Sequence, residues 1–185
     1  MASEKDRMLR GVPYLANDSA LLEERKRCRL VCERFNATSF ADTAARRAIL
    51  DELLGELGED AEVMAPFECD YGYHITIGPR TFINYGAVVL DGASVKIGAD
   101  VQIGPNVQLL TAVHALDPVE RRRGTETAQP VTIGDGAWLA AGVIVCPGVS
   151  IGADTVIGAG SVVTKDLPPG HVCYGNPCRV IREVG

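Results

Sequence analysis

The chain has 185 residues, which at about 150 residues per domain is enough for one sizeable hydrophobic core and argues against two. Its 46% hydrophobic content is ordinary for a globular protein, whereas 20 glycines and only 5% aromatic residues favour a fold with many turns. The formal net charge of −6, without an uninterrupted basic block, argues against binding to nucleic acid or anionic membranes. No apolar signal region opens the chain and no run approaches the ~18 apolar residues that span a bilayer, so we expect a cytoplasmic protein.

Two helices are predicted near the N-terminus. From Asp18 to about Phe35, apolar residues recur on one helical face, with Asp18 or Ser19 as the N-cap. A second helix is expected to start near Asp42 and to stop at Gly58. Residues 1–60 are therefore predicted to form a small helical extension, and its charged stretch EERKR is most simply a solvated face.

After Pro66 aliphatic residues recur every six positions, and six of them are followed directly by glycine. A helix repeats at 3.6 and an isolated amphipathic strand at 2, so a period of six indicates short strands joined by tight turns in a parallel β-helix. The predicted inward-facing residues are Ile77, Ile83, Val89, Ile97, Ile103, Leu109, Ile133, Leu139, Val145, Ile151, Ile157 and Val163.

The six-residue period fails in two places. Val89 and Ile97 are eight residues apart, which indicates a small adjustment at a corner. Between Leu109 and Ile133, polar residues such as Arg121 and Thr127 fall where inward aliphatic residues are expected, so residues 111–130 are predicted to leave the coil as a long loop. Such a loop on a rigid scaffold is a common place for function. The β-helix domain is predicted to span residues 61–185.

Six cysteines raise the question of disulfides or a zinc site, but the sequence contains no CxxC pair. Cys28 and Cys32 lie four residues apart on the first predicted helix, where we interpret them as small buried hydrophobic residues. No metal site is predicted from these residues.

Several segments identify a family resemblance that covers nearly the whole chain. It is carried by FECDYGYHITIG, FINYGAVVLD, GPNVQLLTAVHALDP, the glycine-rich stretch from PVTIGDG to KDLPPG, GNPCRVIRE, and the N-terminal MLRGVPYLANDSALLEERKRC. These segments resemble the maltose and galactoside O-acetyltransferases. The resemblance implies a left-handed coil, although the general rule for parallel crossovers would give a right-handed one. It also implies a homotrimer with active sites between subunits, and acetyl-CoA as the acetyl donor.

For catalysis, the resemblance points to His114, Asn84 and Glu126. His114 lies in TAVHALDP, which is similar to the family's catalytic segment, and an imidazole can accept a proton near neutral pH. Glu126 in GTETAQP would hold the other ring nitrogen, or would be a solvated loop carboxylate. Asn84 in FINYG would contact the acceptor or donate to the oxyanion, the alternative being a turn residue. His74 and His171 are expected to be structural or surface residues.

For the acceptor, Asp70 and Asp91 resemble positions whose carboxylates bind sugar hydroxyls. The acidic residue that the family has near the N-terminus falls at Leu15 or Ala16 here, and Asp18 is a candidate replacement. For the donor, the resemblance implies a coenzyme A site with small residues along the pantetheine arm and basic residues at the phosphates. Its predicted members are Ala141, Ala159, Thr164, Lys165, Arg179, Arg182 and Trp138, the last with packing as an equal alternative.

The predicted reaction is direct acetyl transfer from acetyl-CoA to a hydroxyl of a maltose-, glucose- or galactoside-type sugar, with His114 as general base. Three alternatives remain at this stage. A γ-type carbonic anhydrase shares the coil but needs three histidine ligands to zinc, and the three histidines here lie in separate segments. A non-catalytic trimeric binding or scaffold protein would not require the site residues together. An acetyltransferase with a non-sugar acceptor is the third.

Overall fold

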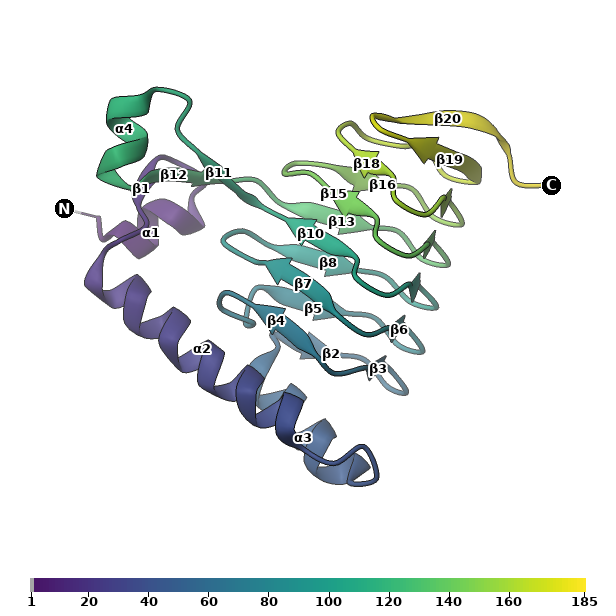
Figure 1. The fold of residues 1–185 in the computed structure, drawn as a ribbon, viewed down its shortest axis with the longest axis horizontal. Coiled ribbons are helices and arrows are strands. Elements are labelled where there is room, and N and C mark those ends of the chain that lie inside the picture. The colour runs from purple at the N-terminus through teal and green to yellow at the C-terminus, as the bar shows by residue number, and fades with distance from the viewer. Residues whose placement is uncertain (1) are drawn as a thin grey trace.

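The computed structural model describes residues 2–185. An N-terminal helical region is followed by a coil of short parallel strands (Figure 1). The N-terminal elements are α1 (Glu4–Leu9), β1 (Tyr14–Leu15), α2 (Ser19–Ala37) and α3 (Thr43–Leu53). None of the helices within residues 2–185 has the length and apolar character needed to cross a membrane.

The coil has three faces, each a sheet of mainly parallel strands, and the chain passes through them in turn. The first face contains β2 (Glu56–Leu57), β5 (Ile75–Ile77), β8 (Val95–Ile97), β13 (Val131–Ile133) and β16 (Ser150–Ile151). The second contains β3 (Glu62–Val63), β6 (Phe82–Ile83), β9 (Gln102–Ile103), β14 (Trp138–Leu139), β17 (Val156–Ile157), β19 (His171–Gly175) and the antiparallel β20 (Cys178–Glu183). The third contains β4 (Phe67–Cys69), β7 (Ala87–Leu90), β10 (Gln108–Leu110), β15 (Ile144–Val145) and β18 (Val162–Val163).

The hydrophobic core runs along the axis of this coil. All twelve predicted inward-facing aliphatic residues are buried, none more than 3% exposed. Parallel pairing stacks equivalent residues of successive turns, as in the column of Ile77, Ile97, Ile133 and Ile151 on the first face. The period of six is therefore explained by one inward residue per face and one corner per face.

Glycines that follow the inward residues allow the turns of the coil to stack closely. A Cβ atom on Gly78 would lie 2.5 Å from the carbonyl carbon of Gly98 in the next turn. The backbones are thus too close for any side chain at that corner, which is the physical reason for the recurring aliphatic-glycine pair.

The two predicted helices are present, with different ends. Asp18 caps α2 by accepting hydrogen bonds from the backbone N–H groups of Ala20 and Leu21. Helix α3 ends at Leu53 instead of Gly58, because Leu57 already belongs to β2 and pairs with Ile77 of the coil. Helices α2 and α3 lie across the N-terminal end of the coil (Figure 1).

Between β10 and β13 the chain leaves the coil as an ordered excursion, residues 111–130. It consists of β11 (Ala112–His114), α4 (Pro118–Arg123) and β12 (Thr125–Ala128). Strands β11 and β12 pair antiparallel, and β1 from the N-terminal region pairs with the free edge of β12. The excursion therefore projects from the coil toward α1 and β1, and it is held there by a three-stranded sheet (Figure 1).

Candidate active site

The small antiparallel sheet places three side chains side by side. His114 of β11 is directly opposite Glu126 of β12, and Tyr14 of β1 is opposite the same glutamate. Nδ1 of His114 lies 3.3 Å from Oε1 of Glu126, and the Tyr14 hydroxyl donates a hydrogen bond of 3.0 Å to Oε2. The glutamate therefore connects a tyrosine and a histidine from segments about 100 residues apart in the sequence.

Exposure to solvent increases from Tyr14 through Glu126 to His114. The Tyr14 residue is only 3% exposed, the Glu126 side chain 16%, and the His114 side chain 65%. Burial, together with the negative charge of Glu126, raises the pKa of Tyr14 well above its usual range, so the phenol remains a donor. The outer nitrogen of His114, Nε2, is left for a molecule arriving from solvent. Tyr14 was not among the predicted site residues, because nothing in a two-residue strand indicates its partner.

A second group lies at the corner between the third and first faces, which we call the excursion corner. Asp70 and Asp91 occupy it in successive turns, next to the start of the excursion. Oδ1 of Asp91 accepts the backbone N–H groups of Asp70 and Tyr71, at 3.0 and 2.8 Å. Oδ2 of Asp91 is buried without a hydrogen-bond partner in the part of the chain that the structure describes.

Both carboxyl groups are shifted by their surroundings. Burial raises the pKa of Asp91, and burial together with the charge of Asp91 raises the pKa of Asp70 to about 6. The neighbouring His74 is anchored by a 2.7 Å contact between its Nδ1 and the Asp91 carbonyl oxygen. The corner therefore holds a buried carboxylate, Asp91, with one oxygen unpaired among the described residues, beside the less buried Asp70.

A third group lies at the opposite edge of the third face, at the corner between the second and third faces. Asn84, Ala141 and Ala159 follow β6, β14 and β17 there, so we call it the alanine corner. Successive turns are joined at this corner by backbone hydrogen bonds such as Gly160 N–H to the Ala141 carbonyl, 2.9 Å. Oδ1 of Asn84 accepts the Tyr85 backbone N–H at 2.8 Å, which leaves the two Nδ2 donors available.

The remaining predicted donor residues are spread over the C-terminal half. Trp138 opens β14 and is 51% exposed. Thr164 and Lys165 follow β18 at the excursion corner, while Arg179 and Arg182 lie on β20, all exposed. Within one chain the structure brings His114 and Glu126 together, and Asp70 and Asp91 together. The third face of the coil separates both pairs from the alanine corner.

The three histidines lie apart from one another within one chain. His74 precedes β5, His114 is on β11 and His171 begins β19, where its Nδ1 contacts the Pro169 carbonyl. Among residues 2–185, the one group of three potential ligand side chains that converge consists of cysteines. The histidine arrangement that a γ-type carbonic anhydrase needs is thus not found in this part of the chain.

Comparison with known proteins places this geometry in a family. Residues 7–58 match a profile described as the maltose acetyltransferase hexapeptide capping motif, and residues 130–165 match the bacterial transferase hexapeptide repeat. A crystal structure of a maltose O-acetyltransferase from Clostridium difficile is 45% identical, covers 100% of this chain and 98% of that one, and superposes with a TM-score of 0.97. The chain belongs to the maltose and galactoside O-acetyltransferase family.

Two further relatives within this acetyltransferase family were solved with ligands. A hexapeptide-repeat acetyltransferase from Vibrio cholerae, complexed with acetyl-CoA, is 37% identical over all of both chains, with a TM-score of 0.91. A galactoside acetyltransferase complexed with coenzyme A is 36% identical over 100% of this chain and 92% of that one, with a TM-score of 0.95. These matches confirm the predicted family and fold class: a left-handed parallel β-helix with a short N-terminal helical region. The chain is an acetyltransferase of this family.

Proposed function

We propose that this acetyltransferase moves the acetyl group of acetyl-CoA directly to a hydroxyl of a sugar, with His114 as general base. The observation that carries the proposal is the position of His114: on a projecting strand, exposed at Nε2, and held at Nδ1 by a partly buried carboxylate. A base in this arrangement can approach a substrate while its ring orientation is fixed from behind.

In the proposed reaction, Nε2 of His114 accepts the proton of the sugar hydroxyl as that oxygen attacks the thioester carbonyl. The tetrahedral intermediate then collapses, the carbon–sulfur bond breaks, and the proton on Nε2 passes to the leaving coenzyme A sulfur. The sugar acetyl ester and free coenzyme A are the products. No covalent enzyme intermediate forms, so neither a serine nor a cysteine nucleophile is required.

Glu126 supports this cycle as a positioning residue. Its Oε1 faces Nδ1 of His114 and favours the tautomer whose Nε2 can accept a proton, and its charge stabilises the imidazolium that forms. Tyr14 donates to the other carboxylate oxygen and fixes the glutamate rotamer. A positioning role is supported over that of a solvated loop carboxylate by the 16% exposure of the Glu126 side chain, its hydrogen bond at Oε2 and its contact with His114 at Oε1.

The excursion corner is the proposed acceptor site. Carboxylate oxygens accept hydrogen bonds from sugar hydroxyls, and Asp91 Oδ2 is a buried acceptor without a partner among residues 2–185. Asp70 belongs to the preceding turn of the coil, and its backbone N–H donates to the same Asp91 side chain. The N-terminal contribution predicted near Leu15, Ala16 or Asp18 is not proposed for Asp18, whose carboxylate already caps α2.

Acetyl-CoA is proposed to lie along the alanine corner, with Asn84 Nδ2 donating to the oxyanion. Support comes from the small residues and exposed backbone of this corner, and from the two relatives complexed with coenzyme A or acetyl-CoA. The alanine corner and the excursion corner lie at opposite edges of one face, which supports a site that draws on two chains. A homotrimer, in which the excursion corner of each chain faces the alanine corner of the next, would supply three such sites.

The test measures free-thiol release from acetyl-CoA across a panel of sugars. One sugar should stimulate release by the unmodified chain, and His114→Ala should lower the rate by the ~10²- to 10⁴-fold expected of a general base. His171→Ala is the matched control and should have no effect. Acetyl-CoA binding without sugar-dependent release would refute the sugar acceptor and favour a non-sugar one. Failure to bind acetyl-CoA would favour a non-catalytic trimeric binding protein.

A further inference from the structure

Three cysteine side chains converge where the N-terminal helical region meets the coil. Cys28 and Cys32 lie four residues apart on one face of α2, and Cys69 ends β4, against which that helix packs. The Cys69 sulfur is 3.5 Å from the Cys28 sulfur and 3.7 Å from the Cys32 sulfur, and all three lie within 4.8 Å of one another. All are free thiols, and those of α2 are buried.

We propose that Cys28, Cys32 and Cys69 form a binding site for a thiophilic metal ion, and that the ion best matched to it is Cu(I). A metal–sulfur bond of about 2.3 Å places three sulfurs of a trigonal site about 4.0 Å apart, and those of a tetrahedral site about 3.8 Å apart. The observed separations fall around these values, so three bonds could form with small side-chain adjustments and no movement of α2 away from β4.

The ligand set decides between metals. Among residues 2–185 no histidine or carboxylate joins the three cysteines closely enough to be a fourth ligand. Soft thiolates favour Cu(I), zinc and iron–sulfur clusters, but structural zinc sites are closed by four protein ligands. A set of three sulfurs without a fourth protein ligand therefore suits Cu(I) better than Zn(II).

Basic side chains near the cluster suit the charge of a copper complex. Binding of Cu(I) by all three cysteines as thiolates would release their protons and leave a charge of −2 on the complex. Arg25 and Arg29 line the cavity that reaches Cys69 and could offset part of that charge.

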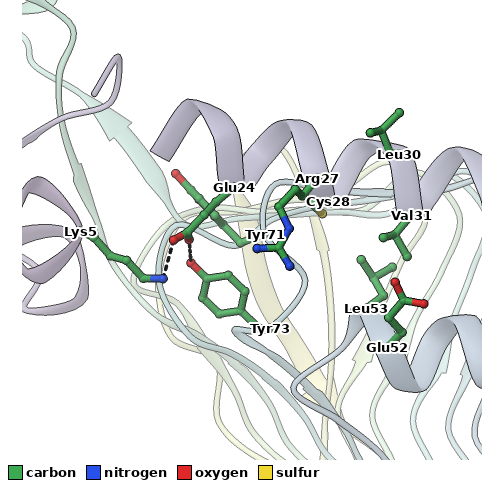
Figure 2. A pocket seen from close by; sticks show the side chains of 10 residues that line it. All are labelled: Lys5, Glu24, Arg27, Cys28, Leu30, Val31, Glu52, Leu53, Tyr71 and Tyr73. Atoms are coloured by element: carbon green, nitrogen blue, oxygen red, sulfur yellow. Dashed lines mark hydrogen bonds and ion pairs between the residues drawn. The ribbon is translucent and has the colours of Figure 1, made fainter. Parts of the chain in front are cut away.

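An ion can reach the cluster from two sides. Cys28 lines a surface cavity of about 520 Å³ between α2 and Tyr71 and Tyr73 of the excursion corner, shown in Figure 2. The second cavity, with Arg25 and Arg29 on its wall, reaches Cys69. The cluster is therefore near solvent on two sides although its sulfurs are largely covered.

The proposal is tested on the full-length, fully reduced protein without oxygen. Cu(I) is titrated in competition with a chromophoric Cu(I) chelator, and Zn(II) is titrated in parallel. The expected result is one Cu(I) per chain, with thiolate-to-copper charge-transfer absorption and a higher unfolding temperature, because the ion binds only the folded arrangement. Cys28→Ser and Cys69→Ser should each abolish this binding, and Cys146→Ser, which alters a cysteine outside the cluster, should keep it.

Three outcomes would overturn the proposal. The first is the absence of stoichiometric Cu(I) binding by the unmodified chain, and the second is retention of binding by Cys28→Ser or Cys69→Ser. The third is a higher affinity of the unmodified chain for Zn(II) than for Cu(I). X-ray absorption on the Cu(I)-loaded unmodified chain gives an answer without any variant: three sulfur neighbours support the site, and fewer, or nitrogen and oxygen neighbours, contradict it. None of these measurements depends on acetyl transfer.

Discussion

Mixed assemblies of two inactive variants test whether each active site draws on two chains. His114→Ala removes the base from the excursion, and Asn84→Ala removes the amide from the alanine corner. In one chain these residues are separated by the third face of the coil. If sites form between neighbours, a site becomes complete when a chain with His114 faces a chain with Asn84.

The expected recovery follows from that geometry. Each variant alone should keep at most about 1% of the activity, because a general base contributes ~10²- to 10⁴-fold and an oxyanion donor ~10²- to 10³-fold. After unfolding and refolding a 1:1 mixture, half of the sites receive an intact excursion and half an intact alanine corner. About a quarter of the sites are therefore complete, given a threefold arrangement with a fixed direction around the ring. That recovery is more than tenfold above either parent.

The assay is sugar-dependent thiol release, before and after joint refolding. Chain exchange is checked independently, by co-purification of two chains that carry different affinity tags. If sites form between subunits, refolding the unmodified chain with the double variant should also lower complete sites from about half to about a quarter of all sites. If the tags show exchange while the two single variants give no recovery, His114 and Asn84 act within one chain, and the proposed site between subunits is wrong.

The remaining predictions concern substitutions of single residues. Glu126→Gln should lower kcat about tenfold with little change in the KM for acetyl-CoA, because the charge-assisted contact to His114 is long, at 3.3 Å, and the histidine is exposed. Tyr14→Phe should have a smaller effect in the same direction, and a change confined to KM would contradict both. Asp91→Asn keeps the Oδ1 acceptor for two backbone N–H groups, so the unfolding temperature should not fall. The same variant should raise the KM for the sugar. Asp91→Ala removes both acceptor oxygens and should lower both the affinity for the sugar and the stability. Leu139→Ala should cost about 2–5 kcal/mol of stability at a fully buried position, measured by urea unfolding at fixed protein concentration, whereas Trp138→Ala next to it should change stability by about 0.5 kcal/mol or less.

The coil could be predicted from the sequence because its order repeats. One inward aliphatic residue per face is a local rule, and twelve copies of it, six of them followed by a glycine, leave a period that is visible in a single sequence. The first turn was harder to recognise. Leu57 and Val63 continue the period, but Leu57 also continues the apolar face of α3, and only the pairing of β2 with β5 assigns it to the coil.

The contacts that the sequence did not reveal are non-local. Tyr14 reaches Glu126 through a strand of two residues, and Cys69 reaches Cys28 and Cys32 from the coil to a helix. Neither contact has a period or a fixed spacing. The pair His114 and Glu126 was identified from resemblance, and the hairpin register now gives its physical reason: the two residues are direct cross-strand neighbours.

The interruptions of the six-residue period carry information of their own. The steps from Cys69 to Ile77 and from Val89 to Ile97 are eight residues long, and the excursion separates Leu109 from Ile133. All three interruptions fall at the same corner, where β4, β7 and β10 end. A parallel β-helix stacks equivalent corners, so extra residues in successive turns enlarge one region of the surface. Asp70, Asp91 and the excursion with His114 are the residues inserted there. The breaks in the repeat therefore lead to the excursion corner without any reference to a family, and they give an independent physical reason to place the acceptor beside His114.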